Sequence, residues 1–359
     1  MHCAINKWNL LVKILYGIQA TGNGHISRSR MLAKYFNQHK IDVEVQYLFS
    51  GRDPQQLFDM EAFGEFWHRQ GLTFVTQNGQ VDYLKSAFHN NLFRFLYDVI
   101  NLPVDNFDLL ITDFEPVTAW AAKLHNKPVI GIGHQYAFGE NTPVTGANFI
   151  AKSILKNFAP AKKSVGLHWH AFDNNILPPI IDTQLQTKTL TEHNNIIVVY
   201  LPFESQTAVT QLLQHFPQWH FIQYAPDVED KNQANVSLRK VCYQGFKNDL
   251  CQARGVICNS GFELISECLH LSLPILTKPI KGQMEQLSNA HALAQLKFAT
   301  IMHELCEKTT ETWLATINNQ ENTVTKIIPD VAKALVNWIL NDPEQPIEQL
   351  STQLWKMTH

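Results

Sequence analysis

The alternation of short apolar runs with stretches of helical periodicity is the feature that most constrains the fold of this chain. Strand-like runs cover residues 11–18, 41–49, 107–112 and 128–133. Between the first two runs, residues 31–36 carry apolar side chains at the spacing of an amphipathic helix. Strands that alternate with helices form βαβ units, and these units predict a parallel sheet covered by helices.

The same alternation restarts after a break. Prolines and polar residues interrupt the pattern between about residues 159 and 193, and new strand-like runs follow at 196–201, 220–223, 255–258 and 274–277. A chain of 359 residues is also longer than one typical core supports. The sequence therefore predicts an α/β protein whose two Rossmann-like domains face each other across a cleft. The predicted units are an N-terminal domain (1–165), a C-terminal domain (190–342) and a closing helix (343–359).

Charge and cysteine usage exclude several classes of protein. The 29 basic and 32 acidic residues give a net charge of −3, which argues against nucleic-acid binding by bulk charge. The six cysteines include no CxxC pair, so we interpret them as reduced thiols. We find no run of 18 apolar residues and no signal-peptide pattern near the first residue. These features favour a cytoplasmic location.

The first candidate motif follows the first strand-like run and reads Gly22, Asn23, Gly24, His25. Glycines at a strand-to-helix turn let the backbone approach a ligand closely. Ser27 stands where a dinucleotide-binding motif has its third glycine, which argues against NAD. A histidine at the end of a strand can act as a general base, although His25 could also only cap the helix.

The second motif places Asp113 and Glu115 at the end of the run 107–112. Ligands of open α/β sheets bind at the carboxyl ends of strands. Asp113 could hold the His25 imidazole as an acid orients the base in a triad. Alternatively, Asp113 and Glu115 could hold a divalent metal, or Asp113 could cap the following helix. His134 also follows a strand-like run and is a further candidate for the cleft.

The third motif, residues 259–290, is the most specific. Ser260 and Glu263 fit a capping box, and the helix start at Ser260 and Gly261 offers backbone N–H groups to a phosphate. Glu267 lies one turn beyond Glu263 on the same face. A carboxylate there could accept two hydroxyl hydrogen bonds, which suits the diol of a ribose.

The order of residues in this third motif resembles the donor-binding signature of GT-B glycosyltransferases. The closest resemblance is to the enzymes that add N-acetylglucosamine to the lipid-linked peptidoglycan precursor and to UDP-glycosyltransferases, and the first loop with Arg28 is similar too. The residues that carry the resemblance are Ser260, Gly261, Ser266, Glu267, Leu273, Pro274, Pro279, Glu285, Gln286, Asn289 and Ala290.

The resemblance implies a nucleotide sugar on the C-terminal domain and an acceptor on the N-terminal domain. Glu267 would hold the donor ribose, and His25 would be the base with Asp113 beside it. Three departures stand out. Many members have a histidine at Asn259 and an asparagine at Glu263, and no Trp-x-x-Gln start of the plant-type motif precedes Asn259. The donor-binding set that we predict is Gly24, Asn259, Ser260, Gly261, Glu263, Glu267, Glu285 and Gln286, with Gly22, Asn23, Glu115 and His134 as further cleft candidates.

We therefore predict a metal-independent, inverting hexosyltransferase that needs no cofactor and moves a sugar from a UDP-linked donor to a hydroxyl acceptor. The alternatives are a nucleotide-sugar 2-epimerase and a non-catalytic nucleotide-sugar-binding protein. The acceptor could be lipid- or glycan-linked. Four lysines and no acid lie in residues 151–164, which suggests peripheral contact with the inner face of the membrane, although a solvated linker explains them as well.

Overall fold

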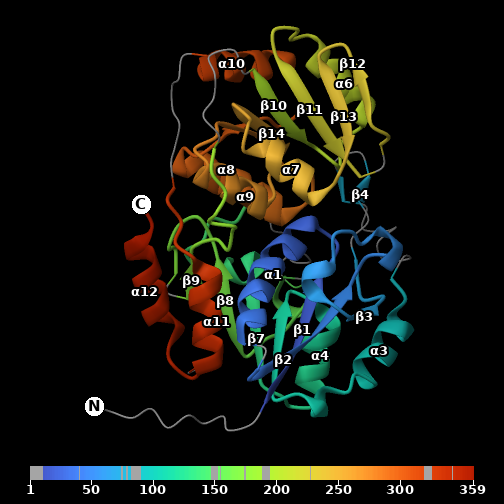
Figure 1. Ribbon diagram of the computed structural model, residues 1–359, viewed down its shortest axis with the longest axis vertical. Coiled ribbons are helices and arrows are strands. Elements are labelled where there is room, and N and C mark those ends of the chain that lie inside the picture. Colours follow the sequence, from blue (N-terminus) through green and yellow to red (C-terminus); the bar gives the residue numbers. More distant parts are fainter. Residues whose placement is uncertain are drawn as a thin grey trace.

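The computed structural model describes residues 11–39, 41–73, 76–77, 80–81, 90–146, 153, 155–173, 175–187, 195–226, 228–318, 326–341 and 343–359. Within these residues the chain forms two seven-stranded sheets and a separate two-stranded one, β4 (Thr76–Gln77) with β5 (Gln80–Val81). The large sheets lie one above the other, each with its own helices (Figure 1). The predicted α/β architecture with two Rossmann-like domains is confirmed.

The first sheet is parallel throughout, with the strand order β3-β2-β1-β6-β7-β8-β9. Seven of the eight residues of β1 are buried, as is typical of a central parallel strand. Its strands are β1 (Val12–Gln19), β2 (Val43–Ser50), β3 (Phe66–Arg69), β6 (Leu109–Asp113), β7 (Val129–Gly133), β8 (Lys163–Leu167) and β9 (Ile176–Leu177). The helices are α1 (Asn23–Phe36), α3 (Leu92–Ile100) and α4 (Pro116–Leu124).

The second sheet has the order β12-β13-β11-β10-β14-β15-β16, and only the edge strand β12 is antiparallel to its neighbour. Its strands are β10 (Ile196–Tyr200), β11 (His220–Ala225), β12 (Lys231–Gln233), β13 (Val236–Lys240), β14 (Gly255–Asn259), β15 (Ile275–Lys278) and β16 (Thr300–Ile301). The helices are α6 (Gln206–Gln214), α7 (Tyr243–Leu250), α8 (Phe262–His270), α9 (Met284–Leu296) and α10 (Glu307–Asn318).

Segments that lie outside the predicted N-terminal domain (1–165) also pack on the first sheet and its helices. The first sheet continues past residue 165, because β9 pairs with β8. This strand lies within residues 159–193, where the sequence pattern predicted a linker. After α10 the chain returns, and α11 (Val331–Asn341) packs against α1 (Figure 1). Helix α12 (Ile347–Met357) then covers β9, where Ser351 and Trp355 both donate to the carbonyl oxygen of Ile176. The local sequence pattern could not predict that α11 and α12 return to the first domain, because it does not contain the surface that these helices cover.

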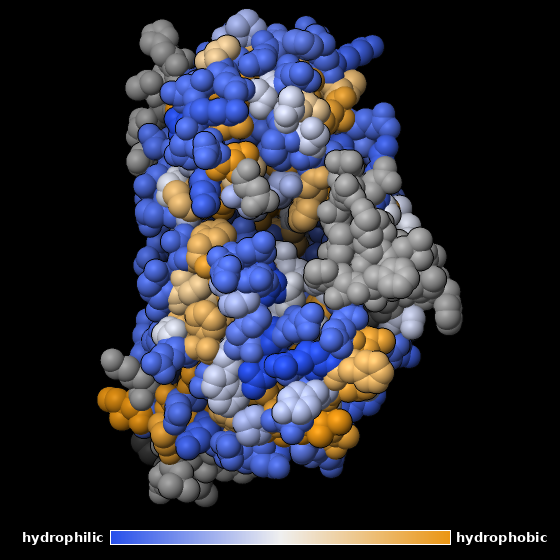
Figure 2. All heavy atoms as spheres, turned by 90° about the vertical axis from the view of Figure 1, so that its right-hand side faces the viewer, coloured by the Kyte–Doolittle hydropathy of each residue, from blue (hydrophilic) through white to orange (hydrophobic). Residues whose placement is uncertain are grey.

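One helix of the first domain leaves an apolar face uncovered. The exposed large side chains on α3 are Leu92, Phe93, Leu96, Tyr97 and Ile100. Figure 2 looks onto the side that carries α3 in Figure 1, and hydrophobic residues gather in its lower half. Among the described residues, no helix is long and apolar enough to cross a membrane.

Candidate active site

The first and second motifs meet at the carboxyl edge of the first sheet. Strands β1 and β6 are neighbours, and the chain leaves β1 toward α1 and β6 toward α4. This is the point where the strand order reverses, the usual ligand site of an open α/β sheet. His25 in the first turn of α1 therefore lies beside Asp113 at the end of β6, and Nδ1 of His25 is 2.6 Å from Oδ1 of Asp113.

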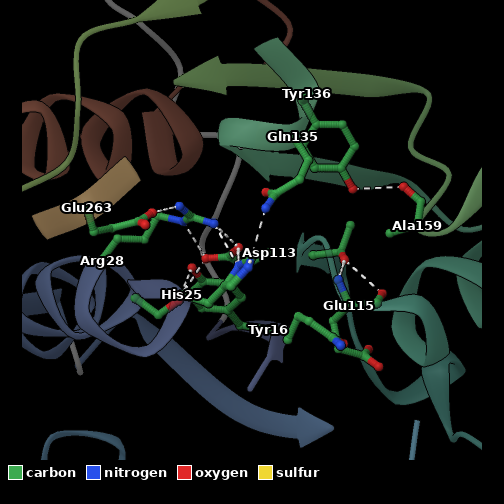
Figure 3. Close-up of polar contacts among 12 residues, drawn as sticks. Tyr16, His25, Arg28, Asp113, Glu115, Gln135, Tyr136, Ala159 and Glu263 are labelled. Atoms are coloured by element: carbon green, nitrogen blue, oxygen red, sulfur yellow. Dashed lines mark hydrogen bonds and ion pairs between the residues drawn. The ribbon is translucent and has the colours of Figure 1, made fainter. Parts of the chain in front are cut away.

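Asp113 is the centre of a buried polar network (Figure 3). Its Oδ2 accepts hydrogen bonds from Nε of Arg28 at 2.7 Å and from the hydroxyl of Ser29 at 3.2 Å. The Ser29 hydroxyl also bonds the phenol of Tyr16. Burial would raise the pKa of Asp113, but the charges of Arg28 and His25 outweigh it and hold that pKa below its usual value. Asp113 is therefore an anion that orients the His25 ring.

Glu115 has a structural role that differs from both alternatives for this motif. Its carboxylate accepts from the backbone N–H groups of Val117 and Thr118 and from the hydroxyl of Ser50. Glu115, rather than Asp113, is thus the N-cap of α4. Because protein donors occupy both carboxylates, the pairing of Asp113 with Glu115 on a metal is disfavoured. Among the described residues no three histidine, cysteine or acidic side chains are grouped to hold a metal.

The third motif forms the facing edge of the second domain. The predicted capping box is wrong: the N-cap of α8 is Gly261, and no side chain in the described part of the chain caps the helix. Ser260 instead bonds the hydroxyl of Thr277 across the sheet, and Glu263 forms an ion pair with Arg28 of the first domain. Contacts with residues that are distant in the sequence therefore take the place of the predicted capping contacts. A Cβ atom built on Gly261 would meet nothing within 4 Å, so open space adjoins the start of α8.

Three further residues of this motif are largely committed to protein contacts. Glu267 is buried and forms an ion pair with Lys247 of α7. Oε1 of Gln286 accepts from the backbone N–H of Ile280 at 3.0 Å, which leaves its Nε2 as the half able to meet a ligand. The amide of Asn259 donates to the carbonyl of Lys278. Lys247 gave no signal in the sequence, because nothing near it marks a partner 20 residues away.

The remaining cleft candidates lie where the two domains touch. His134 is fully buried; its Nδ1 donates to the carbonyl of Leu167, and its Nε2 lies 2.6 Å from Oδ1 of Asn289 in α9. Its ring also stacks on Phe262 of α8, with the centroids 4.1 Å apart. Asn23 is the first residue of α1 and follows its N-cap Gly22. The side-chain amide of Asn23 donates to the phenol of Tyr200 in the second domain.

Gln135 lies at the contact between the two domains, and the predicted set did not include it. Its Nε2 donates to Oε2 of Glu285 at 3.0 Å and lies 3.5 Å from Nε2 of His25. Figure 3 shows its side chain pointing from beyond β7 toward His25 and Asp113. Among the described residues its Oε1 is buried without a hydrogen-bond partner, as is Oε1 of Gln283, two residues before Glu285. The only signal in the sequence was its position after a strand, next to His134.

The comparisons with known proteins agree with this architecture. The family model described as glycosyl transferase family 1 matches residues 12–318. No curated protein matches the chain significantly. Among solved structures, the glycotransferase of kitacinnamycin is 13% identical with a TM-score of 0.58 over 96% of this chain and 99% of that chain. MurG of Acinetobacter baumannii is 14% identical with a TM-score of 0.52 over 97% and 100%.

A third structure, a proposed UDP-N-acetylglucosamine 2-epimerase from Listeria monocytogenes, is 11% identical with a TM-score of 0.55 over 94% of this chain and 97% of that chain. At such identities these similarities show the fold alone, which is the two-domain GT-B fold. The family match is more specific, because it spans most of the chain and both motif-bearing domains. The chain belongs to glycosyl transferase family 1 and is a glycosyltransferase of the GT-B fold.

Proposed function

We propose that this glycosyltransferase moves a sugar from a UDP-linked donor to an acceptor hydroxyl in a single inverting displacement, without a metal ion. The contact between Nδ1 of His25 and Oδ1 of Asp113 carries the proposal. It directs the other ring nitrogen toward Gln135 and the second domain. The His25 side chain is 13% exposed while Asp113 is fully buried, so a substrate could reach the imidazole alone.

His25 would act as the base. Its Nδ1–H donates to Asp113, and Nε2 takes the proton of the acceptor hydroxyl as that oxygen attacks the anomeric carbon of the donor. The bond from this carbon to the phosphate oxygen breaks, and its electron pair leaves with the nucleoside diphosphate. Asp113 stabilises the imidazolium that forms. A positioned base of this kind typically contributes about 10²- to 10⁴-fold in rate.

The start of α8 would stabilise the leaving diphosphate. A helix N-terminus carries partial positive charge and free backbone N–H groups, and none of the described side chains caps this one. The open space beside Gly261 leaves room for a phosphate. Developing negative charge can thus be met without a metal ion.

Recognition of the donor would divide between ribose and sugar contacts. Glu267 would accept the ribose hydroxyls, one turn into the same helix. Glu285 and Nε2 of Gln286 would meet the sugar, and the unpartnered amide oxygens of Gln135 and Gln283 could accept its hydroxyls. Buried acceptors without donors are costly, so a bound hydroxyl would satisfy them.

The proposal includes a cytoplasmic location with peripheral membrane contact, consistent with a lipid- or glycan-linked acceptor. Cys242, Cys258, Cys268 and Cys306 carry free thiols, as in a reducing compartment. The predicted lysine cluster is a weaker basis, since Lys162 bonds Asn126, Lys163 bonds the carbonyl of Pro343, and Lys152 lies outside the described residues. The exposed apolar face of α3 is the better candidate. Co-sedimentation with vesicles should fall when Phe93 becomes Ser.

The 2-epimerase alternative has less support. It would need several carboxylates that converge on the sugar, yet Glu115 caps α4, Glu263 pairs with Arg28, and Asp113 is bound on both oxygens. A non-catalytic binding protein would have no use for a buried aspartate that orients a histidine. Release of UDP from a UDP-sugar above background would exclude such a protein.

The test begins with a thermal-shift screen of nucleotide sugars, since a ligand at 100 times its Kd stabilises by about 2.7 kcal/mol. With the UDP-sugar so found, His25→Ala should lower turnover about 10²- to 10⁴-fold. UDP affinity by calorimetry should stay nearly intact, because the donor motif lies in the other domain. Asp113→Asn should give a smaller loss of the same kind. The acid-side fall of the pH–rate profile should disappear in His25→Ala.

His215→Ala is the matched control, since this exposed histidine pairs with Glu307 in the second domain away from the cleft. Full turnover in His25→Ala, or a parallel loss of UDP affinity, would show that His25 is structural or a phosphate ligand.

A further inference from the structure

Arg28 joins two acids that come from different domains. It is 2% exposed, donates through Nε and Nη2 to the two oxygens of Asp113, and donates through Nη1 to Oε1 of Glu263. Figure 3 shows the guanidinium between the two carboxylates, with His25 beside Asp113. Glu263 and Arg28 are 235 residues apart, so this ion pair exists only while the domains are docked.

The charges around His25 give the ion pair a chemical consequence. Asp113 alone would stabilise the imidazolium that forms when His25 accepts a proton. The Arg28 guanidinium binds the same carboxylate and lies 2.8 Å from Nδ1 of His25, so it opposes that protonation. Glu263 neutralises the guanidinium. The group of Asp113, Arg28 and Glu263 therefore carries a net charge of −1 with the domains docked and 0 when Glu263 withdraws.

Two other groups face this cluster. Glu285 of α9 adds a second negative charge from the second domain, since its charge acts on Arg28 and it accepts from the Gln135 amide beside His25. This charge is the same in wild type and in variants of Glu263, so it does not alter the difference that Glu263 makes. The phenol of Tyr16 on β1 joins through Ser29, and burial raises its pKa well above the usual value, so it is uncharged.

We propose that Glu263 is a positioning residue that acts through Arg28 and makes His25 a strong base only when the second domain is docked. The inference rests on the proposed function, in which His25 takes the acceptor proton. It replaces the predicted role of Glu263 in donor binding. Chemistry is thereby tied to domain closure, so an open cleft holds a weak base and does not activate water against the donor.

Gly24 offers a way to separate Glu263 from Arg28 without changing a charge. A Cβ atom built on Gly24 would overlap Oε2 of Glu263 and lie 2.9 Å from its Cδ. The obstructing atoms are the end of a flexible side chain, so Gly24→Ala should displace this carboxylate and leave the backbone in place. The displaced Glu263 keeps its charge but loses the guanidinium.

The experiment compares Glu263→Gln, Glu263→Asp and Gly24→Ala with wild type, by UDP release from the UDP-sugar found in the thermal-shift screen. In Glu263→Gln, the pH at which turnover halves on the acid side should fall by roughly one unit, as expected for a charge a few ångströms away. Turnover should fall about tenfold, because the weaker base takes the acceptor proton less readily. UDP affinity should stay within about threefold of the wild-type value. Gly24→Ala should behave alike, and Glu263→Asp should recover part of the loss.

The control is Asp105→Asn, which removes an exposed ion pair with Lys127 at the other end of β6 and should change nothing. An acid-side fall that stays in place in Glu263→Gln overturns the inference, as does a change confined to UDP affinity. The same comparison can follow the ring-carbon NMR signals of His25, which needs no turnover. If wild type shows no fall that His25→Ala removes, the proposed base itself fails, which is a separate result.

Discussion

Removing Glu267 should damage both stability and donor binding, and the structure allows the two effects to be separated. Glu267 of α8 and Lys247 of α7 form an ion pair whose side chains are 6% and 9% exposed. In Glu267→Ala the Lys247 ammonium stays buried without its partner, which typically costs about 3–5 kcal/mol. If Glu267 also holds the ribose, UDP affinity should fall by roughly 10- to 150-fold, the equivalent of a charge-assisted hydrogen bond of about 1.5–3 kcal/mol.

The separating variant replaces both charges, Lys247→Met with Glu267→Met. A buried ion pair exchanged for apolar side chains of similar volume is often neutral or stabilising, so the free energy of unfolding in urea should return near the wild-type value. UDP affinity measured by calorimetry should stay low. Lys247→Met alone should show the opposite pattern, with lower stability and UDP affinity within a few-fold of wild type, because the Glu267 carboxylate remains.

Two results would refute this reasoning. Wild-type UDP affinity in the stable double variant would show that Glu267 serves Lys247 alone and does not touch the donor. Unchanged stability in Glu267→Ala would show that water or another group satisfies Lys247, against the burial argument.

Three further predictions concern metal, acid and thiol chemistry. Turnover should survive EDTA, because protein donors already occupy Asp113 and Glu115; loss of turnover that Mg²⁺ or Mn²⁺ restores would return the metal alternative. Nδ1 of His168 accepts a hydrogen bond from the backbone N–H of Trp169, and burial holds the pKa of His168 well below its usual value. Below about pH 6.5 the folded protein therefore binds fewer protons than the unfolded chain. The free energy of unfolding should therefore drop on acidification by up to about 1.4 kcal/mol per pH unit from this group, and a urea series should show a shallower drop in His168→Asn. Hydrogen bonds from Thr309 lower the pKa of the Cys306 thiol while burial raises that of Cys258 to about 12, so mass spectrometry after brief iodoacetamide treatment should find Cys306 modified and Cys258 intact.

Much of the fold could be predicted because it depends on local patterns. The first strand was expected at residues 11–18 and is β1 (Val12–Gln19), since a run of apolar residues beside a glycine turn has few other solutions. The meeting of His25 with Asp113 was predictable for the same reason, because carboxyl ends of parallel strands share one edge. The short strand β9 and the return of α11 to α1 had no local signal, since the partner surface decides them.

The residues whose roles the sequence misjudged are those that act across the cleft. Ser260 and Glu263 have the spacing of a capping box, yet each finds a tertiary partner that the local rule does not contain. Asp113 and Glu115 have the spacing of a metal-binding pair, yet Arg28 donates a hydrogen bond to Oδ2 of Asp113. In each case a short-range motif competes with a partner far away in the chain, and burial favours the partner because an unpaired charge there would be costly.

The contacts that dock the two domains and the contacts that build the candidate site are largely the same. Phe262 stacks on His134, Glu285 bonds Gln135, and Glu263 pairs with Arg28. Each of these partners is, or lies within three residues of, a proposed base, sugar or phosphate contact. Substitutions that loosen docking should consequently slow the reaction even where they touch no reacting atom. In the proposed mechanism, closure then provides what neither domain has alone, because the first domain would supply the base while the second would supply the carboxylate that strengthens it and the helix that meets the phosphate.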